Sequence, residues 1–242
     1  MNLKSISKKI RKTILNTIYT AKTGHIGGSL SCVDILISLY FGKHLKFDPK
    51  KPKLKDRDRL IVSKGHATAA YYSVLAHLGF IKISELQTYC RNNTRLATHL
   101  SGSVPGVEFD TGSLGHGLGI ACGLAYSAKI DKKKYKVFAL ISDGELYEGS
   151  VWEALLFASN YKLNNLIIIV DRNNQIVMDK TEDCIKLNPL EKKFKSFGYK
   201  TFQINGHSFK DLDRVFKKIM KKKNSPPTVV IANTIKGKGI SF

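Results

Sequence analysis

The chain has 242 residues, of which 43% are hydrophobic, and 40 Lys and Arg against 19 Asp and Glu give a net charge of +21. That length supports one large core, and we expect a single domain over 1–242. No apolar run approaches the roughly 20 residues of a membrane span. The Lys-rich N-terminus lacks a signal-peptide pattern, so the sequence predicts a cytoplasmic protein with no membrane partner.

The chain begins with two predicted helices and then alternates strands with helices. Ile residues spaced four apart on one stripe predict a helix over 6–19, and an apolar stretch predicts a second helix over 33–40. The later expected strands are 60–62, 137–141, 166–170, 199–204 and 228–232, and the later expected helices are 67–78, 115–129, 147–160, 189–197 and 208–222. This order predicts an α/β fold, doubly wound, with a mostly parallel sheet and helices on both faces.

The lysines and the cysteines exclude some functions. The lysines form short runs at expected loops and helix ends, without interleaved aromatics to stack bases, so we expect no nucleic-acid partner. A solvated surface explains the charge, and so does attraction of phosphorylated substrates or an acidic partner. The lysine runs are Lys8-Lys9, Lys50 to Lys55, Lys132 to Lys134, Lys192-Lys193 and Lys217 to Lys223. The four scattered cysteines, without a CxxC pair, indicate reduced core thiols.

Two hard oxygen ligands follow neighbouring predicted strands. Asp143 comes directly after the apolar run 137–141, and Asn173 follows the run 166–170, thirty positions later. A carboxylate and an amide oxygen at the ends of adjacent parallel strands can share one hard cation. Helix N-termini at the same edge favour anions, so the pattern predicts a divalent metal clamped onto a diphosphate. The alternative is a strand-ending Asp-Gly turn with an Asn cap.

Four histidines lie in loops flanked by glycine, serine or threonine, where imidazole can exchange protons or bind hydroxyl groups near neutral pH. They are His25, His66, His99 and His116. The remaining three, His44, His77 and His207, are expected to be structural.

Eight ordered motifs resemble the diphosphate-binding half of the transketolase family. They are Gly24-His25, Ser63-Lys64-Gly65-His66-Ala67, Pro105 to Glu108, Thr111 to Gly117, Asp143-Gly144-Glu145, Glu148-Gly149, Trp152-Glu153-Ala154 and Lys236 to Gly239. The chain is most similar to the N-terminal subunit of the split, two-chain transketolases, from about residue 10 to 242.

The resemblance implies a thiamine diphosphate-binding fold and gives each motif residue a role. Asp143, Asn173 and the carbonyl of Gln175 are expected to bind Mg²⁺ (or Ca²⁺). The residues expected to contact thiamine diphosphate are His66, Gly112, Leu114, Gly144 and Lys236. His25, His66 and His99 are the expected catalytic histidines. Glu148 corresponds to an acidic residue in an inter-subunit network that links paired active sites, and His116 receives no role.

The implied activity is transfer of a two-carbon ketol unit from a ketose or its phosphate to an aldose or its phosphate. The pyrimidine-binding half of the family is missing from this sequence, so we expect the chain to need a C-terminal subunit, in an α₂β₂ assembly. A further family histidine that touches the diphosphate has no counterpart before Phe242.

Ser142, Ile26, Thr98 and Leu100 depart from the family pattern, so substrate fit is expected to differ. Two alternatives stay open: a transketolase-like carboligase or decarboxylase subunit, including one that acts on a specialised sugar, and a catalytically inactive binding module.

Overall fold

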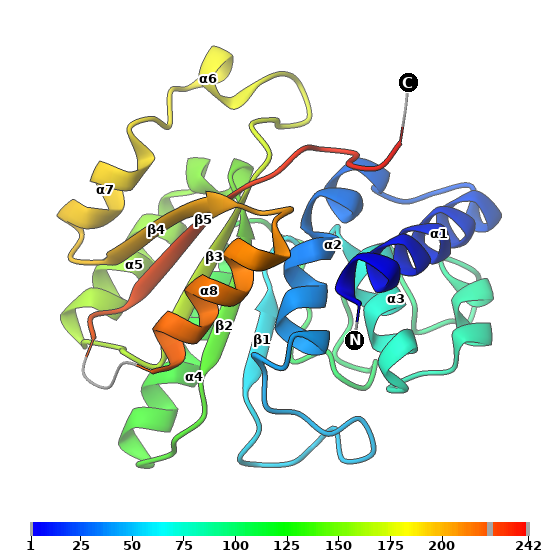
Figure 1. Cartoon of the computed structure of the whole chain (residues 1–242), viewed down its shortest axis with the longest axis horizontal. Helices are drawn as coiled ribbons and strands as arrows, with labels where there is room; N and C mark the ends of the chain where they lie inside the picture. Colours follow the sequence, from blue (N-terminus) through cyan, green and yellow to red (C-terminus); the bar gives the residue numbers. More distant parts are fainter. Residues whose placement is uncertain (1, 222–224, 241–242) are drawn as a thin grey trace.

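A five-stranded parallel sheet forms the centre of the molecule (Figure 1). The structure is a computed structural model that describes residues 2–221 and 225–240. The strands are β1 (Arg59–Val62), β2 (Val137–Ser142), β3 (Leu166–Arg172), β4 (Lys200–Asn205) and β5 (Thr228–Asn233), in the spatial order β1-β2-β3-β5-β4. Every neighbouring pair is parallel, which confirms the predicted α/β class.

Helices cover both faces of the sheet, as expected for a doubly wound fold. One face packs against α1 (Leu3–Ala21), α2 (Ile26–Phe41), α3 (Thr68–Leu78) and α8 (Phe209–Met220). The opposite face packs against α4 (His116–Ile130), α5 (Gly149–Asn160) and α7 (Leu190–Ser196). Figure 1 shows α1, α2 and α3 gathered beside β1, with α8 lying across the near side of the sheet.

Alternation along each strand divides the apolar core into two clusters. On β2, Phe138 and Leu140 belong to the cluster on the α2 and α8 side, whereas Ala139 and Ile141 belong to the cluster under α4 and α5. Successive side chains of a strand point to opposite faces, and all six residues of β2 are buried. Strands buried on both faces read as continuous apolar runs, which is why 137–141 and 166–170 were recognisable in the sequence.

Three short elements were not expected, and α2 begins well before its expected position. The 3₁₀ turns η1 (Ile83–Thr88) and η2 (Gly144–Tyr147) and the short helix α6 (Thr181–Cys184) carry no periodic signal. Helix α2 begins seven residues before the expected position 33, because its glycine-rich first turn packs closely against His66 and Lys236. The last residue of the expected helix 208–222 lies outside the described residues, as do Lys223 and Phe242.

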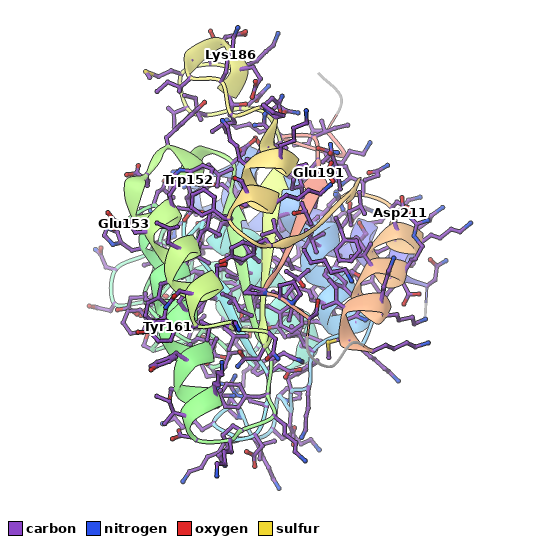
Figure 2. All side chains as sticks on the ribbon, turned by 90° about the vertical axis from the view of Figure 1, so that its left-hand side faces the viewer. Trp152, Glu153, Tyr161, Lys186, Glu191 and Asp211 are labelled. Carbon is purple, nitrogen blue, oxygen red and sulfur yellow. The ribbon has the colours of Figure 1, made fainter. Side chains whose placement is uncertain are left out.

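The segment around α6 projects from the body of the molecule (Figure 1). Figure 2 shows Lys186 on this projection, and shows Trp152 of α5 near α7, where its ring centroid lies 6.1 Å from that of Phe194. All four cysteines are free thiols; Cys32 and Cys122 are buried and Cys90 is partly buried against the core, whereas Cys184, in α6, is exposed, so the expectation of a core thiol is wrong for Cys184. Within the described ranges, no helix is long and apolar enough to cross a membrane.

Candidate functional site

The carboxyl ends of the parallel strands bring the predicted residues to one edge of the sheet. His66 follows β1, Asp143 follows β2, Asn173 follows β3 and Lys236 follows β5. In open α/β sheets, the loops at this edge form the binding crevice. Residues that are far apart in the chain therefore share one region of the molecule.

The Asp143 carboxylate is buried and held by three donors. The Gly144 N–H donates to Oδ1 at 3.0 Å, while the Asn174 N–H (2.7 Å) and the Arg172 Nη1 (3.1 Å) donate to Oδ2. Because β2 and β3 pair in parallel, the residue after β2 lies against the loop that begins at Asn173. The predicted approach of these two loops is present in the structure.

The electrostatics around Asp143 suit a cation. Burial and the neighbouring Asp171 raise the pKa of the Asp143 carboxyl to about 6, although the Arg172 guanidinium acts in the opposite direction. A buried carboxylate whose charge is disfavoured in this way gains from a bound metal ion.

The loop after β3 offers further oxygen atoms. The Asn173 Oδ1 accepts a hydrogen bond from the Gln175 N–H at 3.0 Å, and Gln175 forms an isolated antiparallel bridge with Lys180 that closes the loop. Among the described residues, no three His, Cys, Asp or Glu side chains cluster as a metal centre. Carboxylate, amide and carbonyl oxygens instead fit Mg²⁺ or Ca²⁺, with phosphate oxygens completing the coordination.

Three of the predicted histidines lie side by side. The ring centroid of His25 is 5.5 Å from that of His66 and 5.9 Å from that of His99. Two glycines permit this approach: a Cβ on Gly28 would lie 2.9 Å from His66 Nε2, and one on Gly112 would lie 2.8 Å from His99 Cδ2. The residues predicted as catalytic therefore form one cluster, from the start of α2, the loop after β1 and the loop before α4.

The surroundings of His66 and His25 favour the neutral forms of these two imidazoles. Burial, followed by the charges of Lys64 and His25, lowers the pKa of His66 to about 3. Burial and His99 also lower the pKa of His25. A neutral imidazole can accept a proton at one nitrogen and donate from the other, which suits contact with hydroxyl and carbonyl groups.

A hollow of about 540 Å³ opens beside the histidine cluster. Its lining includes His99, Gly112 and His116, together with the Asp110 side chain. Its size suits a small molecule, and His99, His116 and Asp110 are polar groups in its lining. His116 thus borders the same space as His99, although no role was predicted for it.

Lys236 reaches across the loop that follows β3. Its Nζ donates to the Ile176 carbonyl at 2.9 Å, and a Cβ on Gly144 would lie 3.3 Å from Ile176 Cγ2. The ammonium group and the backbone after Asp143 therefore border the same loop. This juxtaposition places a positive charge beside the loop after Asp143, where an anion can bind.

The predicted residues Leu114 and Glu148 lie near a second buried carboxylate. Glu145 accepts hydrogen bonds from the Gly115 N–H (3.1 Å), the Ser142 N–H (2.8 Å) and the Ser63 hydroxyl. Glu148 is exposed, and a Cβ on Gly115 would lie 2.6 Å from its Cβ. Glu145 thus fixes the loop of Leu114, and Glu148 lies on the surface beside it.

Other charged groups of the site had no predicted role. Lys64 and Asp171 form a fully buried ion pair, with Ser31 and Thr234 also donating to Asp171. Arg172 bonds Thr181 Oγ1 and Glu182 Oε1, each at 2.6 Å, in addition to Asp143. The sequence signal for these residues was a charged residue directly after an apolar strand, a position that is expensive unless paired.

The three histidines expected to be structural have their polar neighbours away from the histidine cluster. His77 Nε2 lies 2.9 Å from Thr13 Oγ1, and His44 Nε2 lies 3.3 Å from Asp213 Oδ1. His207 binds Asp34, with 2.8 Å between Nδ1 and Oδ2.

Residues 3–241 match the family model described as "Transketolase, thiamine diphosphate binding domain". The chain is 41% identical to one subunit of the apulose-4-phosphate transketolase of Phocaeicola vulgatus, over 98% of this chain and 83% of that protein. It is 37% identical to the 6-deoxy-6-sulfo-D-fructose transketolase subunit SqwG of a Clostridium species, over 100% of this chain and 88% of that protein.

A solved transketolase from Campylobacter jejuni superposes with a TM-score of 0.94 at 32% identity. That comparison covers 99% of this chain but 39% of the solved chain. The chain therefore corresponds to a subunit-length protein in some relatives and to less than half of a longer chain in others.

Proposed function

The chain belongs to the transketolase family, and from that premise we propose that it is the N-terminal subunit of a two-chain, thiamine diphosphate- and Mg²⁺-dependent enzyme. The proposed reaction moves a two-carbon ketol unit from a ketose or its phosphate to an aldose or its phosphate. We further propose that 1–242 forms one diphosphate-binding domain and acts in the cytoplasm.

The observation that carries the proposal is the meeting of Asp143 with the Asn173 loop, which Lys236 also contacts. In this proposal, Asp143, Asn173 and the Gln175 carbonyl hold the metal, while Lys236, His66 and the Gly144 backbone hold the diphosphate. Gly112 and Leu114 border the cofactor rings. An all-oxygen site with one carboxylate needs an anionic ligand to complete it, as a diphosphate would.

Thiamine diphosphate held there would supply a nucleophilic carbon and an electron sink for the cleavage of a ketose carbon–carbon bond. The chain's own task is to orient the sugar and to move protons. His25 and His99 are exposed beside one another, and His99 lines the hollow, so they donate to or accept from sugar oxygens. His66 is more deeply buried and stays neutral, so it donates a hydrogen bond without adding charge.

Titration calorimetry with thiamine diphosphate and Mg²⁺ tests the metal site. Asp143→Ala should abolish measurable binding, because it removes the only carboxylate among the proposed ligands. Asp179→Ala, which removes an exposed carboxylate of the same loop, serves as the matched control and should bind as the unaltered chain does. Unchanged affinity in Asp143→Ala would contradict the metal assignment.

We further propose that catalysis needs a C-terminal subunit that supplies the pyrimidine-binding half. Two relatives carry the word "subunit" in their names, which supports a partner chain. The chain alone, supplied with cofactor and Mg²⁺, should show no ketol transfer, and adding the partner should restore it. Appreciable turnover by the chain alone would refute this.

We propose that the face formed by α4 and α5 is a contact surface between subunits in an α₂β₂ assembly. A groove of about 400 Å³ runs there, bordered by Gly119, Gly123, Glu153 and Phe157. A Cβ on Gly119 or Gly123 would meet nothing within 4 Å. Figure 2 shows Glu153 on α5 and Tyr161 directly after its last residue. Glu148 lies at the start of α5, consistent with the proposed inter-subunit role.

The substrate proposal extends to specialised sugars as a second candidate. The two relatives that are subunits of split enzymes are named for apulose-4-phosphate and for 6-deoxy-6-sulfo-D-fructose. A panel of donors, including these two and common ketose phosphates, separates the candidates by kcat/KM. Loss of all turnover with intact cofactor binding would instead favour an inactive binding module.

A further inference from the structure

A buried carboxylate outside the cofactor site joins three distant parts of the chain. Asp34, in the middle of α2, is 4% exposed. Its Oδ2 lies 2.8 Å from His207 Nδ1, and Arg11 of α1 binds both of its oxygens at 2.8 and 2.9 Å. The Ser7 hydroxyl also donates to it at 2.7 Å. We call Asp34, His207 and Arg11 the Asp34 cluster.

The hydrogen-bond pattern assigns the tautomer of His207. The Ile235 N–H donates to His207 Nε2 at 2.9 Å, and a backbone N–H can only donate. Nε2 is therefore without a proton, and the ring proton lies on Nδ1, directed at Asp34. Burial disfavours the ionised form of Asp34, but the bonds from His207 and Arg11 outweigh it and lower its pKa to about 2. The carboxylate thus orients His207 to hold Ile235.

Arg11 binds the other end of the segment 235–238, which begins at Ile235. Its Nε donates to the Lys238 carbonyl at 3.0 Å, and a Cβ on Gly239 would lie 3.0 Å from Arg11 Cδ. Between the His207 contact at Ile235 and the Arg11 contact at Lys238, the Gly237 N–H donates to the Gly27 carbonyl at 3.1 Å. Lys236 therefore sits in a segment that is tied on both sides.

The position of Lys236 leaves little alternative room for its stem. A Cβ on Gly27 would lie 2.9 Å from Lys236 Cγ, so the aliphatic part of the lysine packs directly on the Gly27 backbone. Its Nζ then binds the Ile176 carbonyl. The conformation of the backbone over 235–238 therefore determines the position of the Lys236 ammonium group. Groups that fix this backbone determine the geometry at the site without touching a ligand.

We propose that His207, oriented by Asp34 and assisted by Arg11, is a positioning residue that places Lys236 for contact with a bound diphosphate. The link to the diphosphate rests on the proposed function, whereas the ordering of 235–238 does not.

Limited trypsin digestion of the full chain, without cofactor, tests the ordering directly. Lys236 and Lys238 are themselves cleavage sites, and mass spectrometry resolves loss of the residues beyond each. His207→Ala should speed cleavage there by about tenfold or more, because local opening exposes the segment. His77→Ala removes another partly buried histidine with one side-chain bond of 2.9 Å, and should leave these cleavages unchanged. Equal rates in His207→Ala and the unaltered chain would overturn the proposal.

A double-mutant cycle on the Kd for thiamine diphosphate, measured with Mg²⁺, tests the link to Lys236. His207→Ala should weaken binding by about tenfold, the usual scale for groups that orient a ligating residue. In the Lys236→Ala background the same change should cost less than about twofold, because the positioned group is gone. His207→Gln keeps one acceptor and one donor, and should recover most of the affinity.

An undiminished cost of His207→Ala in the Lys236→Ala background would overturn the positioning role. So would an unchanged Kd in Lys236→Ala alone, and that result would leave the metal site intact as long as Asp143→Ala still abolishes binding. The two proposals can therefore fail separately.

Discussion

Asp143 and Asp171 are neighbouring buried carboxylates, and replacing each by Asn is expected to change the stability of the metal-free chain in opposite directions. Burial and Asp171 raise the pKa of Asp143 from 3.8 to about 6. A group with a raised folded pKa stabilises the fold fully below pH 3.8, and this contribution is lost as pH rises through about 6. At pH 8 the ionised Asp143 therefore costs about 3 kcal/mol relative to its neutral form.

Asp143→Asn should make the metal-free chain more stable at pH 8. The Asn oxygen can still accept from the Asn174 N–H and from Arg172, but the Gly144 N–H loses its acceptor, which costs about 1 kcal/mol. The expected net gain is about 2 kcal/mol in the free energy of unfolding. The gain should shrink as pH falls through 6 toward 4, because the native carboxyl then becomes neutral too.

Urea unfolding followed by circular dichroism, in the presence of a chelator, measures the difference. Asp171→Asn is the matched control: Lys64 lowers the pKa of Asp171 in spite of its burial. Leaving that lysine unpaired in the core should cost about 3 to 5 kcal/mol. If Asp143→Asn is less stable than the native chain at pH 8, or its effect is independent of pH, the electrostatic reasoning is wrong.

Other predictions test different parts of the site. In the unfolded chain His66 takes up a proton below pH 6.5, whereas in the folded chain it does so only near pH 3. The free energy of unfolding should therefore fall between pH 8 and pH 5 by about 2 kcal/mol more in the native chain than in His66→Asn, as measured by urea unfolding. Glu145→Ala leaves buried N–H donors without an acceptor and should lower the free energy of unfolding by about 3 kcal/mol, which thermal and urea unfolding can check. Gly119→Ala, which meets open space within α4, should stabilise the isolated chain by about 0.5 to 1 kcal/mol while weakening assembly in sedimentation experiments. Gly117→Ala, whose Cβ would lie 2.7 Å from Ser63 Cα, should instead destabilise the isolated chain.

The strands and most helices could be predicted because their patterns are local. The run 166–170 has no charged residue and is buried on both faces, so it reads as a parallel strand. The start of α2 was missed because Gly27 and Gly28 favour loops, and only contacts with Lys236 and His66 explain a helix there. The insertion of β5 between β3 and β4 has no local signal at all, since periodicity does not identify a strand's neighbours.

The approach of Asp143 to the Asn173 loop was predictable from two strands that a single helix connects. The roles of Arg172 and of Lys64 were not, because their partners depend on how α6 and α2 pack against the sheet. His207 shows the limit most clearly. A structural role was expected for it, and its contacts with Asp34 and Ile235 are of that kind, but the segment that it holds carries Lys236.

The end of β3 divides consecutive residues between the two sides of the sheet. Asp171 turns toward Lys64 and α2, whereas Arg172 turns toward Asp143 and α6. Successive side chains of a strand face opposite sides of the sheet. Deleting one residue of β3 would therefore place Arg172 on the side of Lys64 and Asp171 on the side of Asp143. Length changes at the exposed residues Val177 and Met178 should therefore leave the sheet intact, whereas a deletion a few positions earlier, within the wholly buried β3, should prevent folding.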